Sequence, residues 1–125
     1  MPGSGAAGGL AGGLLCAGAR LVEGFEVVAD ELDLGDAIEE ADLVVTAEGF
    51  LDEQSFEGKV VGGVAELAAA AGVPCLAVVG EVVEGVTLPE GLEVVSLVER
   101  FGDERAHGET SACIEEVVAE RLARS

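Results

Sequence analysis

The apolar residues of this chain fall into short, nearly continuous runs, separated by longer stretches with helical spacing. Three runs have the length of buried strands, at residues 43–46, 75–79 and 92–97. The run at 75–79 reads Cys-Leu-Ala-Val-Val, which is typical of a parallel strand covered on both faces. We therefore predict a parallel sheet built from these three segments.

Apolar residues recur at intervals of three and four in the stretches around these runs, which predicts helices. The helix before residue 75 is expected to end at Gly72, and Pro74 prevents it from continuing. The last helix is expected to begin at Thr110 or Ser111, either of which can cap it. The predicted helices cover residues 6–19, 25–31, 36–40, 59–71 and the segment from 110 onward.

This order of elements predicts a three-layer α/β fold, in which a small, mainly parallel sheet is flanked by helices. No repeat or low-complexity linker divides the chain, so we expect residues 1–125 to form a single α/β domain. Three strands make a narrow sheet, whose edges are normally covered by further elements. The pattern therefore indicates a part of a larger fold.

The charge of the chain mainly excludes two classes of partner, nucleic acids and anionic membranes. The chain carries 25 acidic and 6 basic residues, a formal charge of −19, and its only lysine is Lys59. Such a surface repels nucleic acids and anionic membranes, so we expect neither as a partner. A GC-rich genome and a salt-rich cytoplasm would each favour an acidic, lysine-poor chain, and the composition does not choose between them.

The cysteines and the histidine indicate no further chemistry. Cys16, Cys75 and Cys113 lack metal-ligand spacing, and their apolar surroundings predict buried free thiols. His107 lies in a polar segment that we interpret as a solvated loop. We find no signal peptide and no charge-free apolar run long enough to span a membrane, so we expect a cytoplasmic protein.

A glycine-rich segment fits the spacing G-x-G-x-x-G from Gly3 to Gly8. A dinucleotide site of this kind needs a strand directly before the first glycine, and we expect none because the chain begins at Met1. We prefer a helix start at which small residues allow close packing. An anion or cofactor contact at Gly5 and Gly8 stays open as the weaker alternative.

The most polar connection follows the first predicted strand and runs from Thr46 to Lys59. Ligands of open α/β sheets bind just beyond the carboxyl ends of the strands, where we expect this segment to lie. Glu48 and Asp52 supply carboxylates that can hold Mg²⁺ or accept a hydroxyl proton, and Lys59 supplies a charge for a phosphate. These groups suit phosphoryl transfer. A solvated connection in which Ser55 caps the next helix explains them equally well.

The same segment resembles the signature of the bacterial glycerate kinase family of type 1, which reads approximately T-G-E-G-R-x-D-x-Q-S-x-x-G-K-x-P-x-G-V-A. The Gly-Ala-Ala-Gly-Gly-Leu stretch from Gly5 and the Ala-Gly-Val-Pro stretch from Ala71 are also similar to that family. The resemblance covers nearly the whole chain, but only the C-terminal portion of a full-length member. The matching signature residues are Thr46, Glu48, Gly49, Asp52, Gln54, Ser55, Gly58, Lys59, Gly63, Val64 and Ala65.

This resemblance implies that the chain is a fragment of a larger two-domain kinase fold. It also implies a reaction, the ATP-dependent phosphorylation of D-glycerate to a phosphoglycerate with Mg²⁺. Catalytic roles are then implied for Asp52, Glu48 and Lys59, with Asp52 or Glu48 as the metal ligand. The implied substrate-binding residues are Gly49, Gln54, Ser55 and Gly58.

Three positions depart from the family pattern, with Ala47 in place of Gly, Phe50 in place of Arg and Val61 in place of Pro. Loss of the Arg removes a planar donor for a carboxylate or phosphate. The family's N-terminal Asp-Ser-Phe-Lys motif has no match, so we expect the isolated chain to be inactive. The alternative is a truncated paralogue that serves as a non-catalytic α/β binding or interaction module. In either case we expect an exposed apolar surface through which the chain self-associates.

Overall fold

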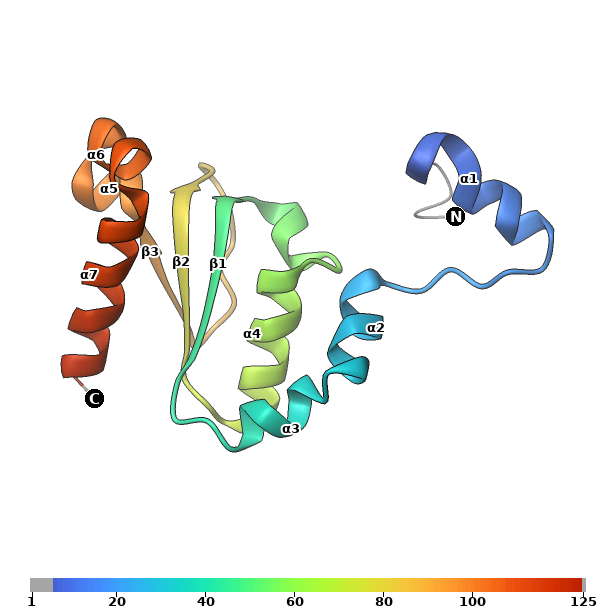
Figure 1. Ribbon diagram of the computed structural model, residues 1–125, viewed down its shortest axis with the longest axis horizontal. Helices are drawn as coiled ribbons and strands as arrows, with labels where there is room; N and C mark the ends of the chain where they lie inside the picture. Colours follow the sequence, from blue (N-terminus) through green and yellow to red (C-terminus); the bar gives the residue numbers. More distant parts are fainter. Residues whose placement is uncertain (1–5, 125) are drawn as a thin grey trace.

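The computed structural model describes residues 6–124 and shows an α/β body around a three-stranded sheet (Figure 1). The strands are β1 (Val44–Leu51), β2 (Cys75–Val82) and β3 (Leu92–Ser96). β2 lies in the middle and pairs in parallel with both neighbours, so that Cys75 lies between Val44 and Leu92. The parallel sheet predicted from the three apolar runs is therefore confirmed.

Helices cover both faces of this sheet, which confirms the predicted three-layer class (Figure 1). On one face α4 packs against β1 and β2, and two short helices pack against α4. On the other face a C-terminal group of three helices packs against β2 and β3. The helices of the first face are α2 (Gly24–Glu31), α3 (Leu34–Glu39) and α4 (Val60–Ala71), and those of the second are α5 (Leu97–Phe101), α6 (Asp103–Gly108) and α7 (Thr110–Ala123).

Small and branched side chains of β2 build the core on both faces. Leu76 and Val78 pack on the C-terminal helices, where Val117 is buried with them. Ala77 and Val79 point to the opposite face and belong to a cluster with Val61 of α4. All four β2 residues are at most 2% exposed, as expected for a strand covered on both faces.

Helix α1 (Ala6–Cys16) lies apart from the α/β body and is joined to α2 by an extended segment (Figure 1). Its Leu10 and Leu14 are 60% and 50% exposed. Cys16 is exposed too, so the prediction of a buried thiol is wrong there, while Cys75 and Cys113 are buried as predicted. The described residues thus carry an exposed apolar surface, and self-association through it stays a prediction. None of the helices within residues 6–124 is long and apolar enough to cross a membrane.

The first strand is longer than its apolar run predicted. β1 continues through Gly49 and Phe50 to Leu51, so residues 46–51 form a strand and not the loop that we expected. The reason is tertiary, because β2 extends past Gly80 and offers these residues a pairing partner. The two strands approach so closely that a Cβ added at Gly80 would lie 2.6 Å from the carbonyl oxygen of Gly49.

The C-terminal helices also differ from expectation. α5 begins where we expected a strand residue, and the hydroxyl of Ser96 caps it by accepting the backbone N–H of Glu99 at 3.3 Å. Thr110 is the first residue of α7, not its cap, and its hydroxyl donates to the carbonyl oxygen of Ala106 at 2.6 Å. His107 belongs to α6 rather than to a loop, although its side chain is 73% exposed.

Candidate functional site

The carboxylates and the lysine of the signature gather at the carboxyl end of β1 and in the turn that follows it. A single 3₁₀ turn, η1 (Glu53–Phe56), carries the chain from β1 to α4. Glu48 lies in β1, Asp52 directly precedes η1, and Lys59 directly precedes α4. Ligands of parallel α/β sheets bind at this end of the strands, as the sequence analysis assumed.

Ser55 connects the two carboxylates through hydrogen bonds. Its hydroxyl is fully buried, donates to Oε2 of Glu48 at 2.5 Å, and accepts the backbone N–H of Asp52 at 3.0 Å. Oδ1 of Asp52 in turn accepts the backbone N–H of Ser55 at 3.1 Å, which completes a capping box on η1. Each carboxylate therefore has one oxygen in this network, and its other oxygen makes no hydrogen bond within residues 6–124.

The expectation that Ser55 caps the following helix is wrong. Lys59 occupies the cap position of α4 and makes no side-chain cap hydrogen bond there. Ser55 instead lies inside η1, which packs directly on the first turn of α4. A Cβ added at Gly62 would lie 2.6 Å from Cα of Phe56 and 2.7 Å from the carbonyl oxygen of Ser55. This close packing fixes the position of the hydroxyl that holds Glu48.

The alternation of side chains along β1 changes beside the site. Glu48 reaches Ser55 on the α4 side of the sheet, and Leu51 also packs on that side, in a cluster with Val61. Because side chains alternate strictly along a regular strand, residues three apart should face opposite sides. The change falls at Gly49, whose backbone contacts Gly80. It allows Phe50 to line the opposite side of the sheet, at the end of the C-terminal helices.

The remaining predicted site residues differ in exposure and in their contacts with neighbouring residues. Gln54 and Lys59 are exposed, and neither side chain makes a hydrogen bond or ion pair within residues 6–124. Gly58 adopts a left-handed backbone (φ 74°), and a Cβ added there would lie 3.0 Å from the Glu23 carboxylate. Ser55 has no exposed surface, so a role in binding substrate stays a prediction.

Gly5 and Gly8 are not brought to this site. Gly5 lies outside the described residues, and Gly8 belongs to α1, which stands apart from the α/β body (Figure 1). A contact between Gly8 and a cofactor held at β1 therefore stays a prediction without support from the described arrangement.

Glu48 and Asp52 fit Mg²⁺ by number and by type of ligand. Mg²⁺ usually takes one or two protein carboxylates and completes its octahedron with phosphate oxygens and water. Within residues 6–124 there is no group of three His, Cys, Asp or Glu side chains that would form a cage for a metal from protein ligands alone. The two carboxylates therefore suit a magnesium ion that arrives with a phosphate.

A pocket of about 420 Å³ opens beside Glu48, between the carboxyl ends of β1 and β2 and the helices α5 to α7. We call it the carboxyl-end pocket. Its β1 wall includes Glu48, Gly49 and Phe50, and its far wall includes His107 and Thr110. No motif or spacing connects residues near 110 with residues near 50, so the sequence alone did not predict the far wall.

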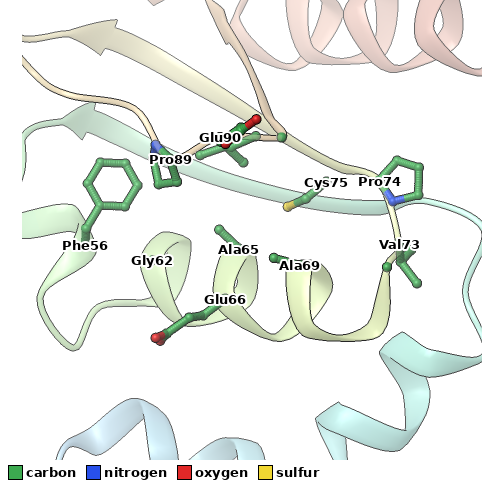
Figure 2. Close-up of a pocket in the computed structure, with 13 residues that line it drawn as sticks. Phe56, Gly62, Ala65, Glu66, Ala69, Val73, Pro74, Cys75, Pro89 and Glu90 are labelled. Atoms are coloured by element: carbon green, nitrogen blue, oxygen red, sulfur yellow. The ribbon is translucent and has the colours of Figure 1, made fainter.

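A larger hollow of about 690 Å³, the α4 groove, runs between α4 and the segment that leads into β3 (Figure 2). Gly62, Ala65 and Ala69 form its α4 side, and Pro89 and Glu90 lie opposite. One end of the groove reaches Phe56 of η1, and the other reaches Pro74 and Cys75 at the amino end of β2, away from the carboxylates. Burial, and secondarily the nearby Glu93, raise the pKa of the Cys75 thiol, which therefore stays protonated.

Comparison with known proteins gives this arrangement a family. The sequence model described as "Glycerate kinase family" matches residues 1–125. The chain belongs to the glycerate kinase family. It is 41% identical over 86 residues to the glycerate kinase of Halalkalibacterium halodurans, a match that covers 68% of this chain and 23% of that protein. It is 39% identical over 98 residues to the glycerate 2-kinase of Escherichia coli K12, covering 76% and 26% respectively.

A solved structure supports the same relationship. The crystal structure of a Salmonella typhimurium LT2 protein assigned as glycerate kinase 2 aligns with a TM-score of 0.59 and 29% identity. The alignment covers 98% of this chain and 33% of that one. This member of the glycerate kinase family thus spans about a quarter of the length of the sequence relatives named above.

Proposed function

We propose that these residues form one half of a phosphoryl-transfer site, which takes part in the ATP-dependent phosphorylation of D-glycerate. The observation that carries the proposal is the pair of carboxylates, Glu48 and Asp52, joined through the buried hydroxyl of Ser55. Membership of the glycerate kinase family and the names of the relatives supply the substrate class.

In this proposal each charged residue has a role suited to its place. One of the two carboxylates accepts the hydroxyl proton of glycerate through its unbonded oxygen. The hydroxyl oxygen of glycerate then forms a bond to the γ-phosphorus of ATP, and the bond from that phosphorus to ADP breaks. The other carboxylate holds Mg²⁺, which when bound neutralises charge on the phosphates. Lys59 is the chain's only lysine, and its exposed ammonium can approach the transferred phosphoryl group as a point charge.

Gln54 is proposed to position glycerate beside these charges. A shallow hollow of about 340 Å³ lies between Asp52, Gln54 and the segment after β2 that includes Gly85. Its lining is acidic, so the carboxylate of glycerate would need Mg²⁺ or the ammonium of Lys59 as a counter-charge there. We propose this hollow as the place of glycerate during the reaction. Gly58 does not line it and is proposed to act only through the shape of the turn.

The proposal predicts binding without turnover by the 125-residue chain, since the chain spans about a quarter of the length of its sequence relatives and has no match to the family's N-terminal Asp-Ser-Phe-Lys motif. A chimera provides the test. The aligned third of the Salmonella protein is replaced by this chain, and ADP release is measured in a coupled assay with D-glycerate, ATP and Mg²⁺. We expect turnover by the chimera and none by the chain alone. A chimera that folds, by circular dichroism, yet consumes no glycerate would contradict the proposal.

A non-catalytic interaction module is the second candidate function. The observation that favours it is Phe50, an apolar ring that is 61% exposed where the family pattern has Arg. The two candidates differ in what Phe50→Arg does to the chimera. If the chain is a decayed module, the unmodified chimera is inactive and Phe50→Arg restores turnover. If the chain retains its catalytic half-site, the unmodified chimera is already active.

We propose that the chain on its own binds further copies of itself. Exposed apolar side chains include Leu10 and Leu14 of α1 and Val27 and Val28 of α2. Removal of such surface from water favours association, and salt screens the repulsion between chains of charge −19. Sedimentation is therefore expected to show dimers or larger species at high salt, which Leu10→Ser with Leu14→Ser would reduce.

A further inference from the structure

We propose that the carboxyl-end pocket binds the adenine base of the nucleotide, with the ring of Phe50 stacked on the base. This inference rests on the proposed function for its choice of nucleotide, and it goes beyond that function by assigning a site to the base. The signature segment supplies only the β1 wall of this pocket, and neither the signature nor the family match assigns a site for the base.

The floor of the pocket suits a flat aromatic group. Val78, Leu97 and Ala106 are at most 5% exposed and form part of the lining, together with Val98 and Ile114. Apolar lining with a few polar groups at the rim is the usual composition of a site for a small organic ligand. Glycerate is polar at every position and would gain little from this floor, whereas a purine would bury both of its faces.

Phe50 supplies a stacking surface at the mouth of the pocket. Its ring is 61% exposed, the largest exposed side chain at the carboxyl end of β1. Aromatic side chains bind nucleobases by stacking, and each stacked base contributes substantially to affinity. The change of alternation at Gly49 places this ring on the pocket side of the sheet while Glu48 faces Ser55.

The polar rim distinguishes adenine from guanine. Nδ1 of His107 lies 2.8 Å from the carbonyl oxygen of Asp103 and 3.2 Å from Oδ1 of the same residue, and both oxygens accept a hydrogen bond. In the neutral ring the proton is therefore on Nδ1, and Nε2 is left as an acceptor. Adenine presents an amino group to such an acceptor, whereas guanine and hypoxanthine present a carbonyl oxygen at the same position.

The position of the pocket agrees with the phosphate chemistry next to it. Glu48 and Gly49 belong both to the pocket wall and to the strand end that carries the carboxylates. A base bound in the pocket can therefore direct its phosphates along β1 toward Asp52. The larger α4 groove touches η1 only at Phe56 and otherwise runs toward Pro74 and Leu92 at the amino ends of the strands, so most of it lies away from the carboxylates.

The experiment is a titration of the ¹⁵N-labelled chain with adenosine, in which the chemical shift of each backbone amide is measured by NMR at every adenosine concentration. Adenosine lacks phosphate, so its binding needs neither the carboxylates nor Lys59. We expect shifts at residues 47–50, 97–98 and 106–110, and a dissociation constant at least about fivefold higher for Phe50→Ala, as the loss of one stacking contact implies. Leu122→Ala removes a similarly exposed apolar side chain from the end of α7, with Leu122 55% exposed and Phe50 61%. It serves as the matched control and is expected to leave the constant unchanged.

Inosine tests the rim in the same titration. We expect it to bind more weakly than adenosine, and His107→Ala is expected to abolish this preference. Shifts confined to other residues, equal affinities for Phe50→Ala and the unmodified chain, or no binding at millimolar adenosine would overturn the inference.

The outcome is separable from that of the proposed function. Adenosine binding at these residues, combined with an inactive chimera, would retain the base site and refute the kinase proposal. An active chimera whose KM for ATP is unchanged by Phe50→Ala would retain the kinase proposal and refute the base site.

Discussion

The end of β1 and the turn after it contain two groups of signature residues whose side chains differ in burial and hydrogen bonding. One group, which we call the held group, consists of Glu48, Asp52 and Ser55, joined by hydrogen bonds around a buried hydroxyl. The other, the free group, consists of Gln54 and Lys59, whose side chains are exposed and bond to nothing within residues 6–124. A single sequence signature thus combines residues that hold the site together with residues whose exposed side chains are available to contact a ligand.

The two groups differ in how much folding free energy is lost when their polar atoms have no hydrogen-bond partner. A buried hydroxyl without a partner destabilises the fold, so Ser55 must bond and its partners are fixed with it. An exposed ammonium is solvated by water and loses nothing when it makes no contact. The held group is therefore expected to matter for stability as well as for chemistry, and the free group for ligands alone. The predictions below test this division.

The largest effect is expected where the backbone beneath the held group is disturbed. Gly80→Ala would place a Cβ 2.6 Å from the carbonyl oxygen of Gly49, beside Glu48, and should lower the free energy of unfolding by about 2–3 kcal/mol. Gly108→Ala introduces the same methyl group in α6 with nothing within 4 Å, and should change stability little. Urea unfolding measures both, and equal stabilities would show that the strand end is not tightly constrained.

Removing the central hydroxyl is expected to have the next largest effect. Ser55→Ala leaves the N–H of Asp52 and the carboxylate of Glu48 without their shared partner, and should cost about 1–3 kcal/mol. Ser111→Ala is the control, because Ser111 is an exposed serine of α7 for which no hydrogen bond of the side chain is seen in the described part of the chain. Thermal unfolding compares the two. A cost for Ser55→Ala no greater than that of the control would remove Ser55 from the held group.

The free group should show the smallest effect on stability. Lys59→Ala is expected to change the free energy of unfolding by less than about 0.5 kcal/mol, as is usual for exposed positions without partners. It should weaken binding of ADP but not of adenosine, since only ADP carries phosphates for the ammonium to contact. Calorimetric titration with both ligands separates these cases. A marked loss of stability, or equal weakening for both ligands, would place Lys59 outside the free group.

Thiol chemistry sharpens the contrast between the α/β body and α1. Cys16 is exposed, whereas Cys75 and Cys113 are buried and the pKa of Cys75 is raised. A thiolate-directed reagent should therefore modify Cys16 first, and the other two only after unfolding. Mass spectrometry of the folded chain identifies the modified residue. Early modification of Cys75 would show that the α4 groove, which Cys75 lines, opens to solvent.

Much of this division lies beyond what sequence patterns can predict. The run at 75–79 and the stop at Gly72 depend on local signals, and both were predicted correctly. The extension of β1 to Leu51 depends on pairing with β2, and the bond from Ser55 to Glu48 depends on η1 packing against Gly62. These contacts join segments whose local composition favours a turn, so no periodicity reveals them. The far wall of the carboxyl-end pocket is more distant still, because α6 and α7 reach β1 only through the folded sheet.

The central claim is that the carboxylates of the held group take part in phosphoryl transfer. The most direct measurement is kcat of the chimera with D-glycerate and Mg²⁺-ATP, compared for Asp52→Asn and Glu57→Gln. Asparagine keeps the capping hydrogen bond on η1 but removes the charge, and Glu57 is an exposed acid that directly follows η1. We predict that Asp52→Asn lowers kcat at least about a hundredfold, while Glu57→Gln stays within about twofold of the unmodified chimera. An Asp52→Asn chimera that turns over glycerate as fast as the Glu57→Gln form would contradict this claim.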